Sequence, residues 1–473
     1  TYVWNDDQQF LSFCITNPDQ RKRMQEVAEY TASMFDEIML DDFWFLNTKT
    51  ESDIQAKGNQ SWTDFRLEQA AEASQKLIID PAKKVNPKVK IIIKYPNWYD
   101  HFQYCGFNLE KQPTQFDLIY TGTETRDPVY THQHLQAYES YAIMRYFENI
   151  APGRNGGGWV DPFNRRTLDR YAEQINMTLF AKARELTLFC FGALLEAIPQ
   201  EDGSFRPLSP VAPVAGYNLD KIDCFLGKLG QPFGIKTYKP YHSSGEDFLP
   251  NYIGMLGIPM EITPDFPAND EIIFLTEQAS FDAKIVEKIK NQLIKGKDVV
   301  ITSGLYRALQ GKGIEDIVEL EYTDKKALVH RFYDWQNVFI AENDILIPQI
   351  RYATNDSWEL ITALDSGNGY TIFHQASYAN GKLYVLTIPD NFGELYELPR
   401  EVLTIIKKVM MKKFFVYTDS PSNVSLLVYD NNTFVLYSFQ DHNTDVNIVL
   451  DNKFNKVTDL LSNQKLTGYQ ENN

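Results

Sequence analysis

The sequence predicts an α/β protein that begins with a (β/α)₈ TIM barrel, continues with a second α/β domain and ends in a small antiparallel β domain. Two observations favour the barrel. Continuously apolar runs, typical of strands buried on both faces, alternate with amphipathic helical stretches through roughly the first 200 residues. Polar and aromatic residues follow these runs at their carboxyl ends, where a barrel builds its active site.

The barrel elements follow one another in a regular order. Strands are predicted at 10–16, 36–45, 89–94, 116–121, 158–162 and 186–192, and helices near 19–33, 63–77, 133–146 and 168–183. Because only six strands are visible, we expect the first two βα units to lie upstream of Thr1 or to be degenerate. A doubly wound sheet is the alternative, but its glycine fingerprint opens a helix, whereas GRNGGGW precedes a strand.

Two further domains follow the barrel domain, which we assign to residues 1–214. Residues 215–412 alternate strands and helices again, with a strand-rich insertion near 315–378. Residues 413–473 contain the hairpin LLVYD-NNT-FVLYSF and predict the small β domain. No cysteine follows a strand in the middle domain, so we expect it to be structural or oligomeric and not a glutaminase.

The composition excludes several classes of protein. The 473 residues include 46 Lys and Arg against 63 Asp and Glu, a net charge of −17, which argues against a nucleic-acid partner. No run approaches the roughly 20 apolar residues of a membrane span. No charged-then-apolar signal opens the chain, and the cellular compartment stays open. Aromatic residues make up 14% of the chain, which suits a protein that stacks neutral rings.

Asp41 and Asp42 close the predicted strand EIMLDDFWF. Successive residues of a strand face opposite ways, so we expect one carboxylate to point into the barrel mouth and the other sideways or outward. Two carboxylates at the end of an apolar strand cost stability unless they are solvated, paired or functional. The alternative is that one Asp caps the loop and the other pairs with a lysine.

Glu124 is the second candidate, in the segment YTGTETRDP two strands later. Glycoside hydrolysis normally needs two carboxylates that flank the scissile bond. Strands two apart in a barrel project their ends across the same mouth, so these residues can meet. The alternative is an ion pair between Glu124 and Arg126 at the rim.

Other strand ends supply candidate substrate contacts. Lys94 would hydrogen-bond sugar hydroxyls and help to keep a nucleophilic Asp ionised. The tryptophans offer stacking faces for pyranose rings, although they fill the space between loops equally well. The predicted substrate-binding residues are Trp44, Lys94, Tyr95, Trp98, Arg126, Trp159, Asp161 and Glu196.

The sequence predicts neither a cofactor nor a metal. His132 and His134 open a predicted helix, but no Cys or H-E-x-x-H partner accompanies them. No G-x-S-x-G nucleophile elbow occurs either.

Several segments resemble known glycoside hydrolases. LGQPFGIKTYKPYHSSGEDFLPNYIGMLGIPMEITPDFP and GKLYVLTIPDNFGELYELP resemble the trimerisation-domain region of family 42 β-galactosidases, and MFDEIMLDDFWF resembles bacterial glycoside hydrolases with an Asp-rich fourth strand. This resemblance implies the order TIM barrel, flavodoxin-like domain and C-terminal β domain. It also implies a carbohydrate substrate and a homo-oligomer formed through the flavodoxin-like domain.

The sequence departs from family 42 at the catalytic positions. That family carries an Asn-Glu pair on the fourth strand and a Glu nucleophile on the seventh, where this chain has Asp41–Asp42 and Asp161. A fourth-strand Asp nucleophile with an acid from the sixth strand is similar to the α-galactosidase clan. The comparison implies Asp42, or else Asp41, as nucleophile and Glu124 as acid/base of a retaining glycosidase. The alternatives are a non-catalytic glycan-binding or scaffold protein, and another sugar-acting barrel enzyme such as an isomerase or lyase.

Overall fold

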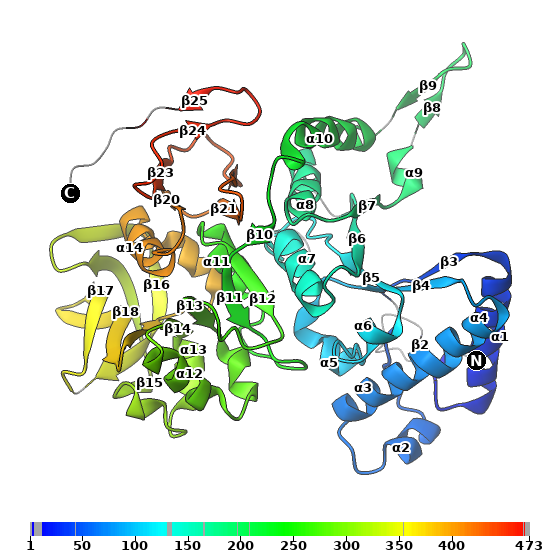
Figure 1. The fold of residues 1–473 in the computed structure, drawn as a ribbon, viewed down its shortest axis with the longest axis horizontal. Coiled ribbons are helices and arrows are strands. Elements are labelled where there is room, and N and C mark those ends of the chain that lie inside the picture. Colours follow the sequence, from blue (N-terminus) through cyan, green and yellow to red (C-terminus); the bar gives the residue numbers. More distant parts are fainter. Residues whose placement is uncertain are drawn as a thin grey trace.

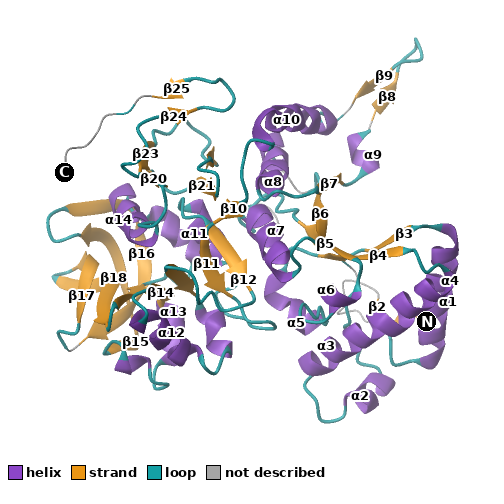
Figure 2. Cartoon of the chain, in the orientation of Figure 1, coloured by secondary structure: helices purple, strands orange, loops and turns teal. Residues whose placement is uncertain are grey.

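Figure 1 shows the computed structural model of the chain, which describes residues 2–3, 12–42, 44–129, 135–163, 166–195, 197–207, 209–352, 354–466 and 468. A region of alternating strands and helices lies at one end of the molecule, and a large mixed sheet lies at the other (Figures 1 and 2). No helix in these ranges is long and apolar enough to cross a membrane.

Five parallel strands form the sheet of the first region, in the order β3-β4-β5-β6-β7. They are β3 (Glu37–Leu40), β4 (Lys90–Tyr95), β5 (Leu118–Gly122), β6 (Asn155–Val160) and β7 (Glu185–Leu188). Each strand pairs with the next one along the chain, which is the winding of a (β/α)₈ barrel. The carboxyl ends of these strands therefore lie along one edge of the sheet.

Helices precede and connect these strands. They are α1 (Pro18–Met34), α2 (Glu51–Lys57), α3 (Trp62–Ala73), η1 (Ser74–Ile79), α4 (Asp80–Val85), η2 (Tyr99–His101), α5 (Phe102–Cys105), α6 (Gln112–Gln115), α7 (Glu139–Ile150) and α8 (Leu168–Phe180). After β7 come α9 (Phe191–Leu194), the hairpin β8 (Ala197–Pro199) and β9 (Phe205–Pro207), and α10 (Val211–Leu226).

The strand predicted at 10–16 is wrong for most of its described length. Only β2 (Ser12–Phe13) is extended, and it pairs antiparallel with β1 (Tyr2–Val3) outside the parallel sheet. The chain turns at this point because the Asn17 side chain accepts the backbone N–H groups of Asp19 and Gln20 and so caps α1.

The glycine run before Trp159 forms β6 and serves packing. A side chain at Gly157 would collide with the backbone carbonyl of Glu185, and one at Gly158 would collide with the methyl group of Thr178 in α8. Glycine therefore lets β6 lie close to both its neighbouring strand and its covering helix.

The second region is a nine-stranded sheet in the order β12-β11-β13-β14-β19-β18-β17-β15-β16. Its parallel part is β11 (Ile235–Tyr238), β12 (Met260–Thr263), β13 (Ile272–Leu275), β14 (Asp298–Thr302) and β19 (Gly381–Leu386), and its antiparallel part is β15 (Leu320–Tyr333), β16 (Val338–Tyr352), β17 (Ser357–Asp365) and β18 (Asn368–Tyr378). The parallel strands run 2-1-3-4-5 by sequence, the order of one common doubly wound sheet. Its helices are α11 (Leu249–Met255), η3 (Glu277–Phe281), α12 (Ile285–Ile294), α13 (Ser303–Leu309), η4 (Ile314–Asp316), η5 (Phe392–Glu397) and α14 (Arg400–Met410).

Short antiparallel strands close the chain. They are β20 (Val416–Asp419), β21 (Val424–Tyr429), β22 (Phe434–Ser438), β23 (Asn447–Leu450), β24 (Val457–Thr458) and β25 (Lys465–Leu466). β21 and β22 form a hairpin, and β10 (Pro232–Phe233) adds to it from the start of the second region.

The regions share contacts and one core. Arg145 of α7 donates to Glu261 of β12 at 2.7 Å, and Tyr138 accepts the backbone N–H of Met260 at 3.0 Å. Tyr429 of β21 donates to the carbonyl of Phe180 at the end of α8. The largest cluster of buried apolar side chains extends from Ile15 to Phe439 and includes residues of both regions, beside two smaller clusters, so the first sheet is held in place by the rest of the molecule.

Candidate active site

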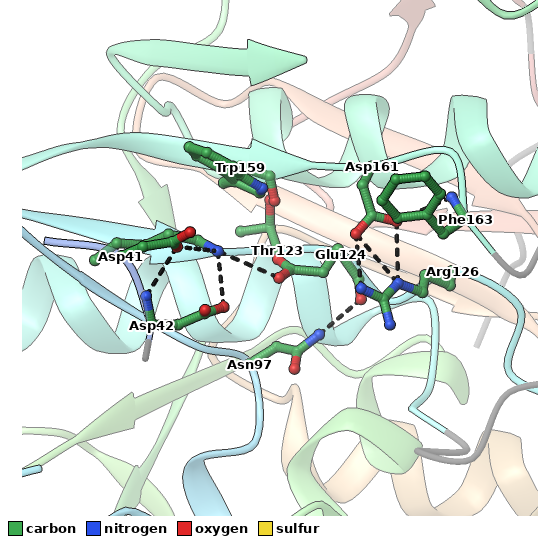
Figure 3. Close-up of polar contacts among 10 residues, drawn as sticks. Asp41, Asp42, Asn97, Thr123, Glu124, Arg126, Trp159, Asp161 and Phe163 are labelled. Carbon is green, nitrogen blue, oxygen red and sulfur yellow. Dashed lines mark hydrogen bonds and ion pairs between the residues drawn. The ribbon is translucent and has the colours of Figure 1, made fainter. Parts of the chain in front are cut away.

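Lys94 is the centre of a buried cluster of charges at the carboxyl end of β4. Its side chain is 2% exposed, and its Nζ lies 2.9 Å from Asp42 Oδ2, 3.4 Å from Asp41 Oδ1 and 3.5 Å from Glu124 Oε1 (Figure 3). Burial alone would lower the pKa of Lys94, but the charges of these three carboxylates raise it. Lys94 is therefore a permanent cation between acidic groups from two other strands.

Both aspartates reach this cation. We expected them on opposite faces of a strand, and this expectation is wrong because β3 ends at Leu40, before either residue. Asp41 Oδ1 then accepts the backbone N–H of Asp42 at 2.8 Å. Asp41 stays 49% exposed, whereas Asp42 is 16% exposed. Burial raises the pKa of Asp42, and the ammonium group of Lys94 opposes this increase.

Glu124 lies just after β5 and is almost fully buried. Its backbone carbonyl accepts a hydrogen bond from Asn97 Nδ2 at 2.6 Å. A side chain at Gly122 would lie 2.9 Å from Glu124 Oε2, so glycine leaves room for the carboxyl group. Burial raises the pKa of Glu124 to about 7, although Lys94 lowers it; Asp161 and Asp42 add to the increase.

Arg126 pairs with Asp161 and not with Glu124. Arg126 Nη2 donates to Asp161 Oδ2 at 2.7 Å, and its Nε donates to Oδ1 at 3.0 Å (Figure 3). The predicted alternative of a rim ion pair between Glu124 and Arg126 is therefore wrong. Asp161 also accepts the backbone N–H of Phe163, which fixes the loop after β6.

An aromatic wall borders the charges. Lys94 Nζ lies 4.4 Å from the ring centroid of Trp159, and Trp159 stacks on Phe189 with 5.0 Å between centroids. Phe163 meets Phe189 edge to face, and these two phenylalanines are about 40% exposed. Sequence reasoning missed Phe163 and Phe189, as well as Asn97. The position of Phe163 two residues after Asp161 was the available signal.

Tyr95, Trp44 and Trp98 serve packing. Tyr95 is fully buried and stacks on Phe147 of α7, so the predicted contact of Tyr95 with substrate is wrong. The reason is strand alternation, since Lys94 and Tyr95 are neighbours on β4 and face opposite ways. Trp44 donates to Ser74 Oγ at 2.9 Å, and the ring of Trp98 packs against Phe107.

Glu196, His132 and His134 lie outside the described residues. Within the described ranges, no group of three His, Cys, Asp or Glu side chains is arranged to hold a metal ion.

Comparison with known proteins gives the family context of this cluster. Residues 1–226 match the family model "Probable glycosyl hydrolase, catalytic domain", and residues 415–473 match "Probable glycosyl hydrolase, C-terminal domain". The chain is glycosyl hydrolase-like. Residues 230–391 match the second domain of the uncharacterized protein SSO3021. SSO3021 of Saccharolobus solfataricus is 24% identical to this glycosyl hydrolase-like chain over 422 residues, covering 80% of the chain and 67% of SSO3021.

Solved structures share the fold. A catalytic mutant of Gan42B, a GH42 β-galactosidase from G. stearothermophilus, is 12% identical with a TM-score of 0.63, covering 96% of this chain and 80% of that one. The β-galactosidase of Bacillus circulans sp. alkalophilus is 10% identical with a TM-score of 0.61, covering 98% and 82%. The α-L-fucosidase isoenzyme 2 of Paenibacillus thiaminolyticus is 12% identical with a TM-score of 0.57, covering 96% and 74%. The predicted resemblance to family 42-like glycoside hydrolases is confirmed.

Proposed function

We propose that this glycosyl hydrolase-like protein is a retaining glycosidase in which Asp42 is the nucleophile and Glu124 the acid/base. One observation carries the proposal: a single buried ammonium group contacts Asp42 at 2.9 Å and Glu124 at 3.5 Å. Because both contacts share Lys94 Nζ, the Asp42 and Glu124 oxygens cannot lie farther apart than the sum of these distances. That limit is below the roughly 6.5 Å at which the inverting range of carboxyl separations begins. The spacing therefore favours attack by the carboxylate itself over attack by an interposed water.

The two carboxyl groups have different environments, as the two steps require. With a pKa of about 7, Glu124 is protonated in about half of the molecules at neutral pH, and in this form it can donate the proton to the glycosidic oxygen. Lys94 favours the ionised form of Asp42, which attacks the anomeric carbon as the C–O bond to the leaving group breaks. Glu124 then takes a proton from water, whose oxygen attacks the same carbon and releases Asp42.

The surroundings suit a saccharide. Trp159, Phe163 and Phe189 offer aromatic surface for one face of a sugar ring, and the ion pair of Arg126 with Asp161 places polar atoms beside them. The sugar is unassigned. The domain limits 1–214, 215–412 and 413–473, and a homo-oligomer through the middle domain, remain predictions.

Substitution of the two carboxyl groups tests the function. We expect Asp42→Asn and Glu124→Gln each to lower the hydrolysis of the preferred aryl glycoside by about 10²- to 10⁴-fold with folding intact. Glu37→Gln is the matched control, because Glu37 lies exposed at the opposite end of β3 and should keep full activity. Activity would be screened on a panel of aryl glycosides, and folding checked by circular dichroism.

Three outcomes would contradict the assignment. Normal turnover by either variant removes its residue from the chemistry. If NMR shows that the first-formed sugar has the opposite anomeric configuration, the reaction is inverting. Binding of oligosaccharides without turnover by the wild-type protein would favour the non-catalytic alternative.

A further inference from the structure

Glu139 is a buried acid that the proposed reaction does not use. It is the first residue of α7, its side chain is fully buried, and neither carboxyl oxygen has a hydrogen-bond partner among the described residues. An unpaired carboxylate in such a place would carry a large desolvation penalty. Glu139 is therefore expected to carry a proton.

The first turn of α7 is joined to the loop that carries Glu124. Ser140, next to Glu139, donates from its hydroxyl to the carbonyl of Thr123 at 2.7 Å and lies 3.2 Å from the hydroxyl of Thr125. These two threonines flank Glu124 in the sequence. The first turn of α7 is therefore hydrogen-bonded to both sequence neighbours of Glu124.

Glu124 and Asp100 are the acidic groups whose charges act on Glu139. Glu124 Oε2 and Asp100 Oδ1 are also buried without a hydrogen-bond partner in the described structure. Ionised carboxylates only accept hydrogen bonds, so they cannot satisfy one another, whereas a protonated carboxyl group donates one. Burial, with the charges of Glu124 and Asp100, raises the pKa of Glu139 well above its usual value. Tyr99, which also faces this region, already donates its hydroxyl proton to the carbonyl of Asp247.

We propose that Glu139 is a positioning residue for Glu124: it stays protonated and donates a hydrogen bond to the Glu124 carboxylate whenever that group ionises. This inference rests on the proposed role of Glu124. Glu124 is ionised while the glycosyl-enzyme intermediate exists, so a neutral donor behind it favours that stage without adding charge. Glu139 itself touches no substrate.

Two neutral substitutions separate donation from packing. Gln keeps the size and a donor, whereas Leu keeps the approximate size and removes the donor. We expect Glu139→Leu to raise the pKa of Glu124 by about 0.5 to 1.5 pH units and to move the basic limb of the kcat profile by the same amount. Glu139→Gln should leave both within about 0.3 pH units of wild type.

The titration is measured without substrate. NMR of ¹³C-labelled glutamate carboxyl groups, assigned with Glu124→Gln, gives the pKa of Glu124 in each variant. An unchanged titration in Glu139→Leu overturns the proposal, as does an equal shift in the Gln and Leu variants. If the Leu variant fails to fold, Glu139→Met serves as a second variant without a donor. Because this readout needs no turnover, absence of glycosidase activity would contradict the proposed function and leave the test of Glu139 intact.

Discussion

Lys94 shows how a single residue sets the chemistry of its neighbours. Its ammonium group contacts carboxylates that come from the ends of β3 and β5, so it joins three adjacent strands. The cation favours ionised Asp42, while deeper burial raises the pKa of Glu124 to about 7. In the proposed reaction, two chemically similar carboxyl groups have opposite roles because they differ in burial and in distance from Lys94.

The raised pKa of Glu124 predicts a pH-dependent stability. Below its unfolded-state pKa, near 4.5, the group is protonated in both states; between that value and about 7 only the folded protein holds the proton. Wild-type stability is therefore lost as the pH rises through this window. Glu124→Gln cannot ionise, so we expect its stability relative to wild type to increase by up to about 3 kcal/mol between pH 4.5 and 8.

Urea unfolding at several pH values from 4.5 to 8 measures this difference. The exposed Glu37→Gln substitution is the control and should show no such trend. Parallel pH profiles for Glu124→Gln and wild type would show that the buried acid titrates normally.

At the residue scale, the sequence predicted which residues form the cluster better than it predicted the orientation of each side chain. The proximity of Asp42, Lys94 and Glu124 could be predicted from the sequence because parallel strands align their carboxyl ends. Tyr95 could not be placed, because the face that a residue of an all-apolar strand occupies depends on the exact residue at which the strand ends. Phe189 looked like core because it continues an apolar run.

At the scale of the element, β6 needs a glycine where it packs against α8. Gly158 lies where a methyl group would collide with Thr178 of α8, while the Thr178 hydroxyl donates to Thr123 Oγ1 at 2.8 Å. Thr178 of the helix therefore both packs against β6 and hydrogen-bonds the residue before Glu124. Close packing here both builds the sheet and positions the acid.

Gly158→Ala should destabilise the fold by about 1 to 3 kcal/mol, because the new methyl group overpacks a tight contact. Thr178→Ser removes the opposing methyl group but keeps the hydroxyl, so the double variant should regain most of the loss. Chemical unfolding of the two single variants and the double variant measures this coupling. Gly216→Ala in α10, where a side chain meets nothing, is the control and should not destabilise. Additive losses in the double variant would contradict the steric explanation.

The positions of strands were predictable where both faces of the strand are buried. The centres of β4 and β5 agree with the sequence prediction because their apolar runs end at polar residues. The segment at 10–16 failed because the apolar pattern carries no information about the cap at Asn17 that turns the chain. Glycine spacing in β6 was visible, but its cause lies in a helix that follows later in the chain.

At the scale of the molecule, the ion pair of Arg145 with Glu261 joins the first sheet region to the second. Both side chains are mostly buried, and Asn149 adds a hydrogen bond to Glu261 at 3.0 Å. Their positions are far apart in the sequence, so neither could be paired in advance. The order of the regions was predictable from local patterns, whereas their interface depends on contacts between distant segments.

Arg145→Ala should lower the free energy of unfolding by about 3 to 5 kcal/mol, because it leaves Glu261 buried without its cation. Since one apolar cluster spans the regions, we expect calorimetry to show a single transition that shifts as a whole. The exposed pair of Arg23 and Glu26 supplies the control, and Arg23→Ala should cost less than about 1 kcal/mol. A separate early transition in the Arg145 variant would mean that the regions unfold independently.

The cluster around Lys94 also bears on substrate selection by charge. Three carboxylates face one ammonium group, and the nearby cation of Arg126 is already paired with Asp161. Acidic groups therefore outnumber basic groups among these residues, and the whole chain also has a net negative charge. A uronic acid or a sulfated sugar would meet electrostatic repulsion there, whereas a neutral sugar would not. Under the proposed function, we therefore expect the substrate to be an uncharged saccharide.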